Sequence, residues 1–348
     1  MTNDVRAHAL TEWVNQQQLT AQALNLTMVS GDASFRRYFR TQGMPNGKEL
    51  IAVDSPPQLE PIDDFLMVTE LLDKQGVKVP EIIAFDKQQG FMLQSDFGDR
   101  SVLADIERQT SDHAKLQTAG QHYHLAMQQL VKIQSATDVD LLADYDRALL
   151  MKELELFREW FLQKKLSIQL TADENILLDR WFELLVDAAV SQPKVTVHRD
   201  YHSRNLMAID QQTVGVIDYQ DSVKGPITYD IVSLLKDCYV RWPRQQQLSW
   251  LQSFYQMLPP KRTQNYSFAK MQRDFDWIGI QRHVKVVGIF CRLSLRDNKH
   301  SYLQDIPLTI AYLLEAMPLY QEHEEVLLWL EQRVKPVAVN SGLAWGCH

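Results

Sequence analysis

The chain has 348 residues, of which 45% are hydrophobic and 23% charged, a composition typical of a globular protein. Its formal net charge of -8 argues against a nucleic-acid-binding protein, which usually carries a basic face. Three cysteines without a C-x-x-C pair predict neither a disulfide framework nor a zinc site. We expect a cytoplasmic protein with reduced thiols that binds no membrane, because neither a signal peptide nor a membrane-spanning apolar stretch is visible.

The first quarter of the chain has the pattern of a small β-rich unit. Residues 4–25 show loose helical periodicity, and a turn cluster at 30–34 then separates two apolar segments. A short strand is predicted over 50–53 and a helix from about Asp63 to Gln75, which Gly76 ends. Two further strand-like runs, 79–85 and 91–94, are joined by a predicted hairpin turn.

Beyond Gly98 the pattern becomes helical, apart from one β-rich island at 194–218. Helical periodicity marks 119–135, 144–165 and 172–190, and helices resume from 228 to the end. We therefore predict an α+β, two-lobed architecture. Residues 1–95 would form a small nucleotide-binding lobe, and residues 96–348 a large, mostly helical lobe for catalysis and substrate binding.

The island carries the pattern that indicates chemistry. H-R-D-x-x-x-x-N spans 198–205, and a predicted hairpin returns the chain to Asp218, beside Asn205. Carboxylate and amide oxygens suit Mg²⁺, which neutralises charge on the phosphates of ATP, and a separate carboxylate orients the attacking hydroxyl and accepts its proton. We predict Asp200 as the catalytic base, Asn205 and Asp218 as metal ligands, and ATP and Mg²⁺ as cofactors. A chance acidic loop and a decayed, inactive kinase are the alternatives.

With these residues the island resembles the aminoglycoside phosphotransferase-like kinases, a branch of the protein-kinase-like fold. The resemblance extends from about residue 10 to 335. Within this branch, the chain looks most similar to the bacterial anomeric N-acetylmuramate/N-acetylglucosamine 1-kinases. This closer similarity is carried by the runs 31–39, 216–221, 225–243 and 281–290. It implies ATP in the cleft and a small sugar substrate phosphorylated at its C1 hydroxyl. The sugar 1-phosphate would serve cell-wall recycling, and a downstream nucleotidyltransferase would share the pathway.

The same resemblance implies which residues contact the nucleotide. The phosphate-covering loop would consist of Ser30, Gly31, Asp32, Ala33, Ser34, Phe35 and Arg36. The connector between the lobes, around Gln94 and Asp96, would contact adenine through its backbone. The loop has one glycine fewer than G-x-G-x-x-G, so by itself it is a weak signal. Asp54 stands where kinases have a phosphate-binding lysine, and the candidates to replace that cation are Arg36, Arg37, Arg40 and Lys48.

Several other motifs are given structural interpretations. Asp96-Phe97-Gly98 spells D-F-G but precedes the catalytic loop, so we interpret it as a connector turn in which Gly98 permits an unusual backbone angle. His198 and His202 lie four positions apart without a third soft ligand, and a buried structural role is favoured for His198. We expect Asp230 to steady the catalytic loop by hydrogen bonds and Glu70 to occupy a surface position on a helix.

The substrate candidates are His202 and Arg204 in the catalytic loop, Asp221 after the hairpin, and Arg282 and His283 on a basic helix over 272–296. That helix either receives a sugar acid or is a solvated face, and arginine suits a carboxylate. Two alternatives to an anomeric sugar kinase stay open. One is a kinase of the same fold that acts on an aminoglycoside, choline or homoserine, and the other is a non-catalytic nucleotide-binding protein.

Overall fold

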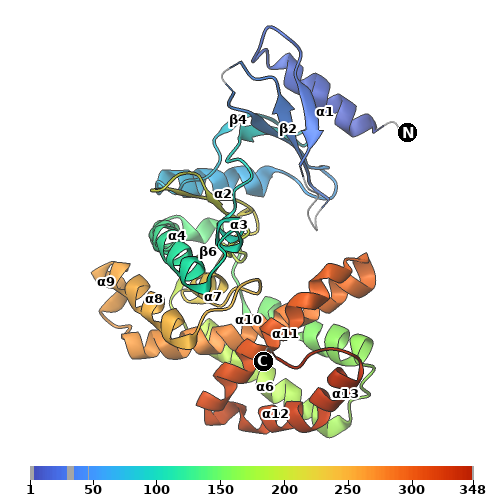
Figure 1. The fold of residues 1–348 in the computed structure, drawn as a ribbon, viewed down its shortest axis with the longest axis vertical. Helices are drawn as coiled ribbons and strands as arrows, with labels where there is room; N and C mark the ends of the chain where they lie inside the picture. Colours follow the sequence, from blue (N-terminus) through green and yellow to red (C-terminus); the bar gives the residue numbers. More distant parts are fainter. Residues whose placement is uncertain (1–3, 30–34, 46, 347–348) are drawn as a thin grey trace. The chain divides into compact units, whose positions relative to one another are not determined.

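The structure is a computed structural model that describes residues 4–29, 35–45 and 47–346 (Figure 1). The chain forms two compact units. The first contains residues up to Lys115 together with Arg204–Asp221, and the second contains Leu116–Ser203 and the chain from Ser222 onward. Packing thus joins 96–115 and 204–221 to the N-terminal residues, while the functional division at residue 95 stays a prediction.

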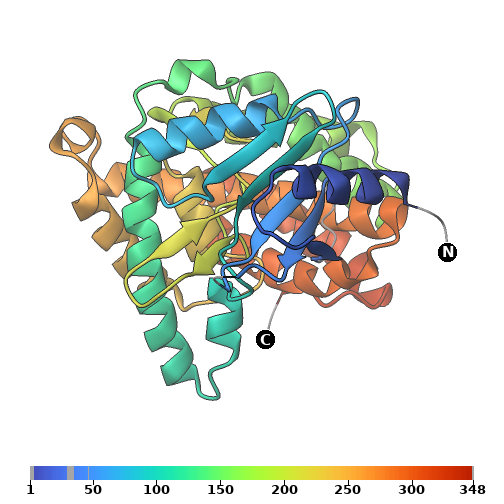
Figure 2. The same cartoon turned by 90° about the horizontal axis from the view of Figure 1, so that it is seen from above.

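The first unit is built on a five-stranded antiparallel sheet with the strand order β1-β2-β3-β5-β4. Its strands are β1 (Asn25–Met28), β2 (Arg37–Gln42), β3 (Leu50–Asp54), β4 (Ile82–Asp86) and β5 (Phe91–Ser95). Helix α1 (Val5–Gln16) packs apolar side chains such as Leu10 and Trp13 against Ala52 and Leu93 of the sheet, and Figure 2 shows α1 alongside these strands. The sheet therefore has one face sealed by apolar burial.

Helix α1 is shorter than the helix predicted over 4–25. It ends at Gln16, and Gln18 adopts a left-handed backbone with φ 54° that cannot continue the helix. The last residue of the predicted helix, Asn25, pairs instead with Gln42 across the β1–β2 ladder. Cross-strand pairing thus overrides the weak helical periodicity after Gln16.

Helix α2 (Asp63–Lys74) and the β4–β5 hairpin agree with the predictions, except that β4 begins at Ile82 rather than at residue 79, and the turn cluster predicted at 30–34 lies outside the described residues. Gly90 closes this hairpin at φ +70°, where a Cβ atom would lie 1.9 Å from the Ser55 carbonyl oxygen. The D-F-G motif is a turn, in which Gly98 has φ +80°. Only glycine adopts such angles without strain.

A second hairpin, β7 (Leu206–Ala208) and β8 (Val214–Val216), belongs to the same unit. Its backbone is anchored on both strands. The Ala208 N–H donates to the Arg100 carbonyl over 2.7 Å, just before helix α3 (Val102–Glu107), and the Val216 N–H donates to the Lys78 carbonyl over 2.8 Å. This hairpin carries the second half of the predicted catalytic pattern.

The second unit is mostly helical and is organised around the long helix α10 (Phe268–Asp297), which packs against five other described α-helices and against the segments η2 (Phe157–Lys165) and η3 (His300–Asp305). The α-helices are α5 (Arg147–Leu156), α6 (Ala172–Val190), α7 (Tyr229–Leu235), α8 (Arg244–Met257) and α11 (Ile306–Ala316). The unit also contains α4 (Asp112–Gln134) from Leu116 onward, and the helices α9 (Pro260–Thr263), α12 (Glu324–Trp329) and α13 (Lys335–Asn340). Its other short 3-10 or π-helical segments are η1 (Val139–Leu141), η4 (Met317–Leu319), η5 (Gln321–His323) and η6 (Leu330–Val334).

A two-stranded sheet, β6 (Lys194–Val197) and β9 (Val223–Pro226), leads into the catalytic loop. Strand β6 is buried over its last three residues, so the loop starts from a fixed position in the second unit. None of the described helices is both long and apolar enough to cross a membrane.

Candidate functional site

The β7–β8 hairpin places two predicted metal ligands side by side in the first unit. The Asn205 side-chain amide donates to Asp218 Oδ2 over 3.2 Å, and the Asn205 carbonyl accepts from the Ile217 N–H over 3.1 Å. Gln220 Nε2 donates to Asp218 Oδ1 over 3.0 Å. The hairpin return predicted from the sequence is thus confirmed, although the metal itself stays a prediction.

The chemistry of this pair fits Mg²⁺. The donor set is one carboxylate and one amide, both oxygen donors, and Mg²⁺ prefers such ligands while keeping waters and phosphate oxygens in its remaining positions. Among the described residues, no group of three or more His, Cys, Asp or Glu is arranged to hold a metal ion. The oxygen atoms of Asn205 and Asp218 would leave the other positions of a bound Mg²⁺ to water and phosphate oxygens.

The loop with Asp200 lies in the second unit, and Asp230 holds it by the backbone. The buried Asp230 carboxylate, in the first turn of α7, accepts from the N–H groups of His198 over 2.7 Å and Arg199 over 3.0 Å. His198 is buried and its ring contacts Tyr201 edge-on. The structural roles predicted for Asp230 and His198 are confirmed.

A second carboxylate, Asp237, holds the other end of this loop and was missed in the sequence. Its Oδ2 accepts from the Ser203 N–H over 3.0 Å and from the Ser203 hydroxyl, while its Oδ1 accepts from the Tyr239 N–H over 3.1 Å. Asp237 is fully buried. The available signal was an aspartate at the end of the apolar run 231–235, since buried carboxylates must be hydrogen-bonded.

Behind the loop, a buried ionic network joins α5, α10 and Arg199. Glu153 accepts from Arg199 Nη2 over 2.6 Å and pairs with Lys285 Nζ over 2.9 Å. The hydroxyl of Tyr145 also donates to Glu153, and Lys285 donates to Tyr229 Oη over 3.0 Å. Sequence analysis missed Glu153, whose only signal was an acidic residue in a largely apolar helix. The network fixes the residue that precedes Asp200.

These charges set the ionisation of Asp200. Its side chain is exposed, yet the surrounding protein displaces bulk water and so acts to raise its pKa. The charges of Lys285, Arg199 and Arg282 act in the opposite direction and prevail, so the pKa of Asp200 lies below its ordinary value of 3.8. Asp200 is therefore ionised at neutral pH, as an acceptor for a hydroxyl proton must be.

The substrate candidates of the second unit have different surroundings. His202 contacts Tyr239 edge-on at 5.4 Å between ring centroids, and its buried Nδ1 has no hydrogen-bond partner in the described part of the chain. His283 is a core residue that stacks on Tyr312 at 4.8 Å and hydrogen-bonds the Lys236 carbonyl. Burial lowers the pKa of His283 to about 3, so its ring is neutral. Its position does not favour a substrate role, whereas Arg282 contacts Cys238, the residue after the loop anchor Asp237.

In the first unit, Arg204 and Asp221 are both exposed. Asp221 Oδ2 accepts from Gln220 Nε2 over 3.5 Å, so Gln220 links it to Asp218. Substrate contacts by Arg204 and Asp221 stay predictions.

The expected nucleotide loop lies mostly outside the described residues, which exclude Ser30, Gly31, Asp32, Ala33 and Ser34. Phe35 is exposed and its N–H donates to Glu60 Oε1 over 2.8 Å. Arg36 is buried, pairs with Glu60 over 3.4 Å and lies over the ring of Phe65. In the connector, Gln94 is buried and Asp96 pairs with Arg40. Nucleotide contacts by these residues stay predictions.

Asp54 replaces the expected strand lysine and is neutralised within the sheet. It is fully buried in β3 and forms ion pairs with Arg6 and Arg37. Two guanidinium groups therefore compensate one carboxylate, which explains how an aspartate is tolerated there. Glu70 has an exposed side chain and pairs with Lys74 on α2, which confirms its predicted surface position.

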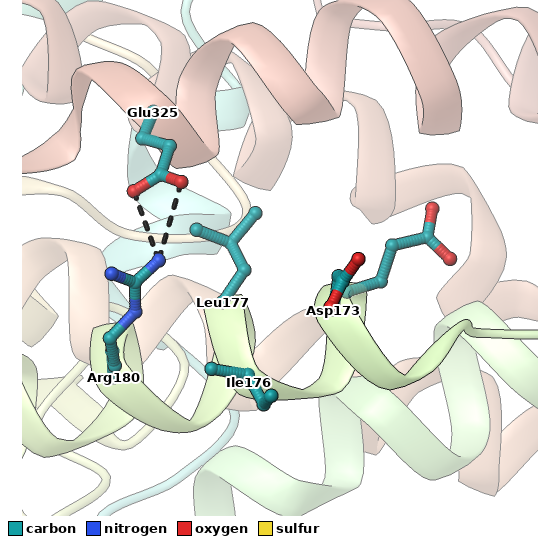
Figure 3. A pocket seen from close by; sticks show the side chains of 6 residues that line it. Asp173, Ile176, Leu177, Arg180 and Glu325 are labelled. Carbon is teal, nitrogen blue, oxygen red and sulfur yellow. Dashed lines mark hydrogen bonds and ion pairs between the residues drawn. The ribbon is translucent and has the colours of Figure 1, made fainter.

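The second unit has a groove lined by residues of α6 and α12. It has a volume of about 400 Å³ and is lined by Asp173, Glu174, Ile176, Leu177, Arg180 and Glu325 (Figure 3). Arg180 on α6 reaches Glu325 on α12 across it, over 3.2 Å. None of the predicted site residues is among those that line this groove.

The chain is similar to a phosphotransferase family and to proteins named as sugar kinases. Residues 25–264 match the model of the phosphotransferase enzyme family. A Pseudomonas putida protein named N-acetylmuramate/N-acetylglucosamine kinase is 38% identical over 325 residues, with 90% of this chain and 93% of that protein covered. A Pseudomonas aeruginosa protein of the same name is 36% identical, with 95% and 99% covered.

Among solved structures, the ADP-bound aminoglycoside phosphotransferase APH(2'')-Ib aligns with a TM-score of 0.57 at 13% sequence identity. The alignment covers 86% of this chain and 96% of that one. At this identity the likeness concerns the fold alone. It confirms the predicted α+β fold of the protein-kinase-like type.

Proposed function

Because the chain belongs to the phosphotransferase enzyme family, we propose that it transfers a phosphoryl group from ATP to the C1 hydroxyl of N-acetylmuramate and N-acetylglucosamine. The observation that carries this proposal is near full-length similarity, at 36–38% identity, to two proteins named kinases of these sugars. The product would be a sugar 1-phosphate, which suits nucleotidyl transfer in cell-wall recycling.

Each residue of the candidate site has a role in this reaction. Asp200, ionised at neutral pH, accepts a hydrogen bond from the C1 hydroxyl and takes its proton as the hydroxyl oxygen attacks phosphorus. Asn205 and Asp218 hold Mg²⁺, which when bound neutralises charge on the phosphates. Asp230 and Asp237 accept hydrogen bonds from backbone N–H groups of the Asp200 loop, and these bonds keep the loop in one backbone conformation. Turnover therefore depends on preorganisation as well as on the base.

A coupled ADP-release assay over a panel of acceptors tests the proposal. The panel contains N-acetylmuramate, N-acetylglucosamine, choline, homoserine and a kanamycin-type aminoglycoside. We expect turnover with the two amino sugars. Activity confined to choline, homoserine or the aminoglycoside would contradict the proposed substrate class, and no ADP release with any acceptor would contradict a kinase of small alcohols.

The position of phosphorylation requires a matched acceptor. The methyl glycoside of N-acetylglucosamine keeps every hydroxyl except the anomeric one, so an anomeric kinase should not turn it over. Equal turnover of the free sugar and its methyl glycoside would place the phosphoryl group on another hydroxyl. Phosphorus NMR of the product gives an independent identification of the sugar 1-phosphate.

A further inference from the structure

Arg282 is a buried cation whose only side-chain hydrogen bond among the described residues is to a thiol. It lies on α10 with 4% of its surface exposed. Its Nη1 donates to Cys238 Sγ over 3.5 Å, a weak interaction with a soft acceptor. Burial raises the pKa of the Cys238 thiol, so this partner brings no negative charge at neutral pH.

The other buried cations of the described chain each have a carboxylate partner. Arg36 pairs with Glu60 over 3.4 Å, Lys236 with Asp276 over 2.9 Å, and Lys285 with Glu153 over 2.9 Å. Arg282 has no carboxylate within 4.0 Å in the residues that the structure describes. Charged side chains are rarely buried without a partner because desolvation is costly. An arginine cannot relieve that cost by losing its proton.

The carboxylate of Asp237, the residue next to Cys238 in the chain, is already engaged. Both of its carboxylate oxygens accept hydrogen bonds. One accepts from the Ser203 N–H in the catalytic loop, and the other accepts from the Tyr239 N–H in the segment that follows α7. Asp237 precedes Cys238, so the Arg282 guanidinium lies next to the residue that anchors the catalytic loop. Its charge also contributes to lowering the pKa of Asp200.

His202 provides a second polar group without a partner in the same unit. Its buried Nδ1 makes no hydrogen bond in the described chain, and its backbone N–H donates to the Asp200 carbonyl over 3.0 Å. An uncompensated guanidinium and an unsatisfied imidazole nitrogen thus flank the residue that would receive the acceptor hydroxyl. Unsatisfied buried polar groups of this kind point to a missing anionic or polar ligand.

Building on the proposed function, we propose that Arg282 binds the carboxylate of N-acetylmuramate and thereby sets the preference between the two sugars. N-acetylmuramate carries a lactyl ether with a carboxylate where N-acetylglucosamine has a hydroxyl. The planar guanidinium can donate two parallel hydrogen bonds to that carboxylate, which removes the unpaired charge. N-acetylglucosamine has no carboxylate to pair with Arg282, so only N-acetylmuramate forms this charged contact.

The test is the ratio of kcat/KM for the two sugars in Arg282→Gln and Arg282→Lys. We expect Arg282→Gln to lose about 100-fold with N-acetylmuramate and less than about 3-fold with N-acetylglucosamine, because only the former loses a bidentate charged contact. Arg282→Lys keeps the positive charge but cannot donate two parallel hydrogen bonds, so its kcat/KM with N-acetylmuramate should fall less than that of Arg282→Gln. Arg296→Gln, at an exposed position of the same helix paired with Asp297, is the matched control and should leave both values unchanged.

A wild-type measurement avoids dependence on folding of the variants. The methyl ester of N-acetylmuramate removes the carboxylate charge from the substrate, and it should reproduce the loss seen in Arg282→Gln with the free acid. In the Arg282→Gln enzyme, ester and acid should be used equally. Equal losses with both sugars, or an ester used as well as the acid by wild type, would overturn the inference. Failure of the wild-type enzyme to phosphorylate either sugar would instead overturn the proposed function.

Discussion

At the residue scale, the predicted metal ligand Asp218 and the residue before Asp200 have a backbone conformation that non-glycine residues rarely adopt. Five non-glycine residues in the described chain have positive φ, and two of them are Arg199, at 76°, and Asp218, at 65°. Such angles cost free energy and persist where surrounding contacts impose them, often at functional sites. At Arg199 the imposing contacts are visible, since Asp230 holds its N–H and Glu153 holds its guanidinium. This left-handed residue directly precedes Asp200 in the chain.

Replacing Asp200 by asparagine removes the proposed proton acceptor while keeping the side-chain shape. We expect Asp200→Asn to lower kcat by about 10²–10⁴-fold, the range usual for general base catalysis, while ATP still binds. The coupled assay and equilibrium nucleotide binding measure the two effects separately.

Asp210→Asn, in the exposed turn of the β7–β8 hairpin, serves as the control and should behave as wild type. Full turnover by Asp200→Asn, or loss of nucleotide binding by a folded Asp200→Asn protein, would contradict the role assigned to Asp200.

At the element scale, the position of α10 depends on a close approach between helix backbones. A Cβ atom on Gly288 would lie 2.4 Å from the backbone carbon of Leu156 and 2.5 Å from the backbone nitrogen of Phe157, where α5 gives way to η2. Backbone atoms cannot move aside as the end of a flexible side chain can. The same helix carries Arg282 and Lys285, so this contact also positions the charges around the catalytic loop.

Gly288→Ala should therefore destabilise the protein although alanine favours helices. We expect a loss of about 1–3 kcal/mol in the free energy of unfolding, the cost usual for overpacking. Gly120→Ala on α4 is the matched control, because its new methyl group would meet only Trp250 Nε1 at 4.0 Å. That control should gain up to about 1 kcal/mol from helix propensity. Denaturant unfolding compares the two, and equal stabilities would show that α10 can shift at no cost.

At the scale of the whole molecule, activity and stability should respond differently to acid. Burial raises the pKa of Asp230 from 3.8 to about 6, so the folded protein binds a proton there before the unfolded chain does. By linkage, this group alone makes the fold more stable as pH falls through 6 toward 3.8. Protonation also weakens Asp230 as an acceptor for the His198 and Arg199 N–H groups, which loosens the catalytic loop.

We predict that kcat falls with an apparent pKa of about 6 while the melting temperature shows no parallel loss at that pH. N-acetylglucosamine at saturating MgATP is the suitable substrate because the sugar has no ionisable group near this pH. Asp230→Asn should have lower activity at pH 7.5 and no further inflection near 6. Constant activity between pH 7.5 and 5, or a loss that follows unfolding, would contradict this assignment.

Much of the fold and of the candidate site could be predicted from the sequence because the signals are local. The spacing from His198 to Asn205, the hairpin that returns to Asp218, and the turns at Gly90 and Gly98 all depend on residues close in the chain. Their physical causes are strand pairing over a short loop and the backbone freedom of glycine, and both operate without the rest of the protein.

Tertiary structure alone decided which charges are compensated. Glu153 and Lys285 are far apart in sequence, and only the packing of α5 against α10 makes them a buried pair. The adjacent residues Arg282 and His283 look equivalent in a basic helix, yet helix rotation places His283 against Tyr312 and Arg282 beside Cys238 without a carboxylate. A residue's charge is encoded in the sequence, but its burial and its partner are properties of the folded chain, and these determine what the charge can bind.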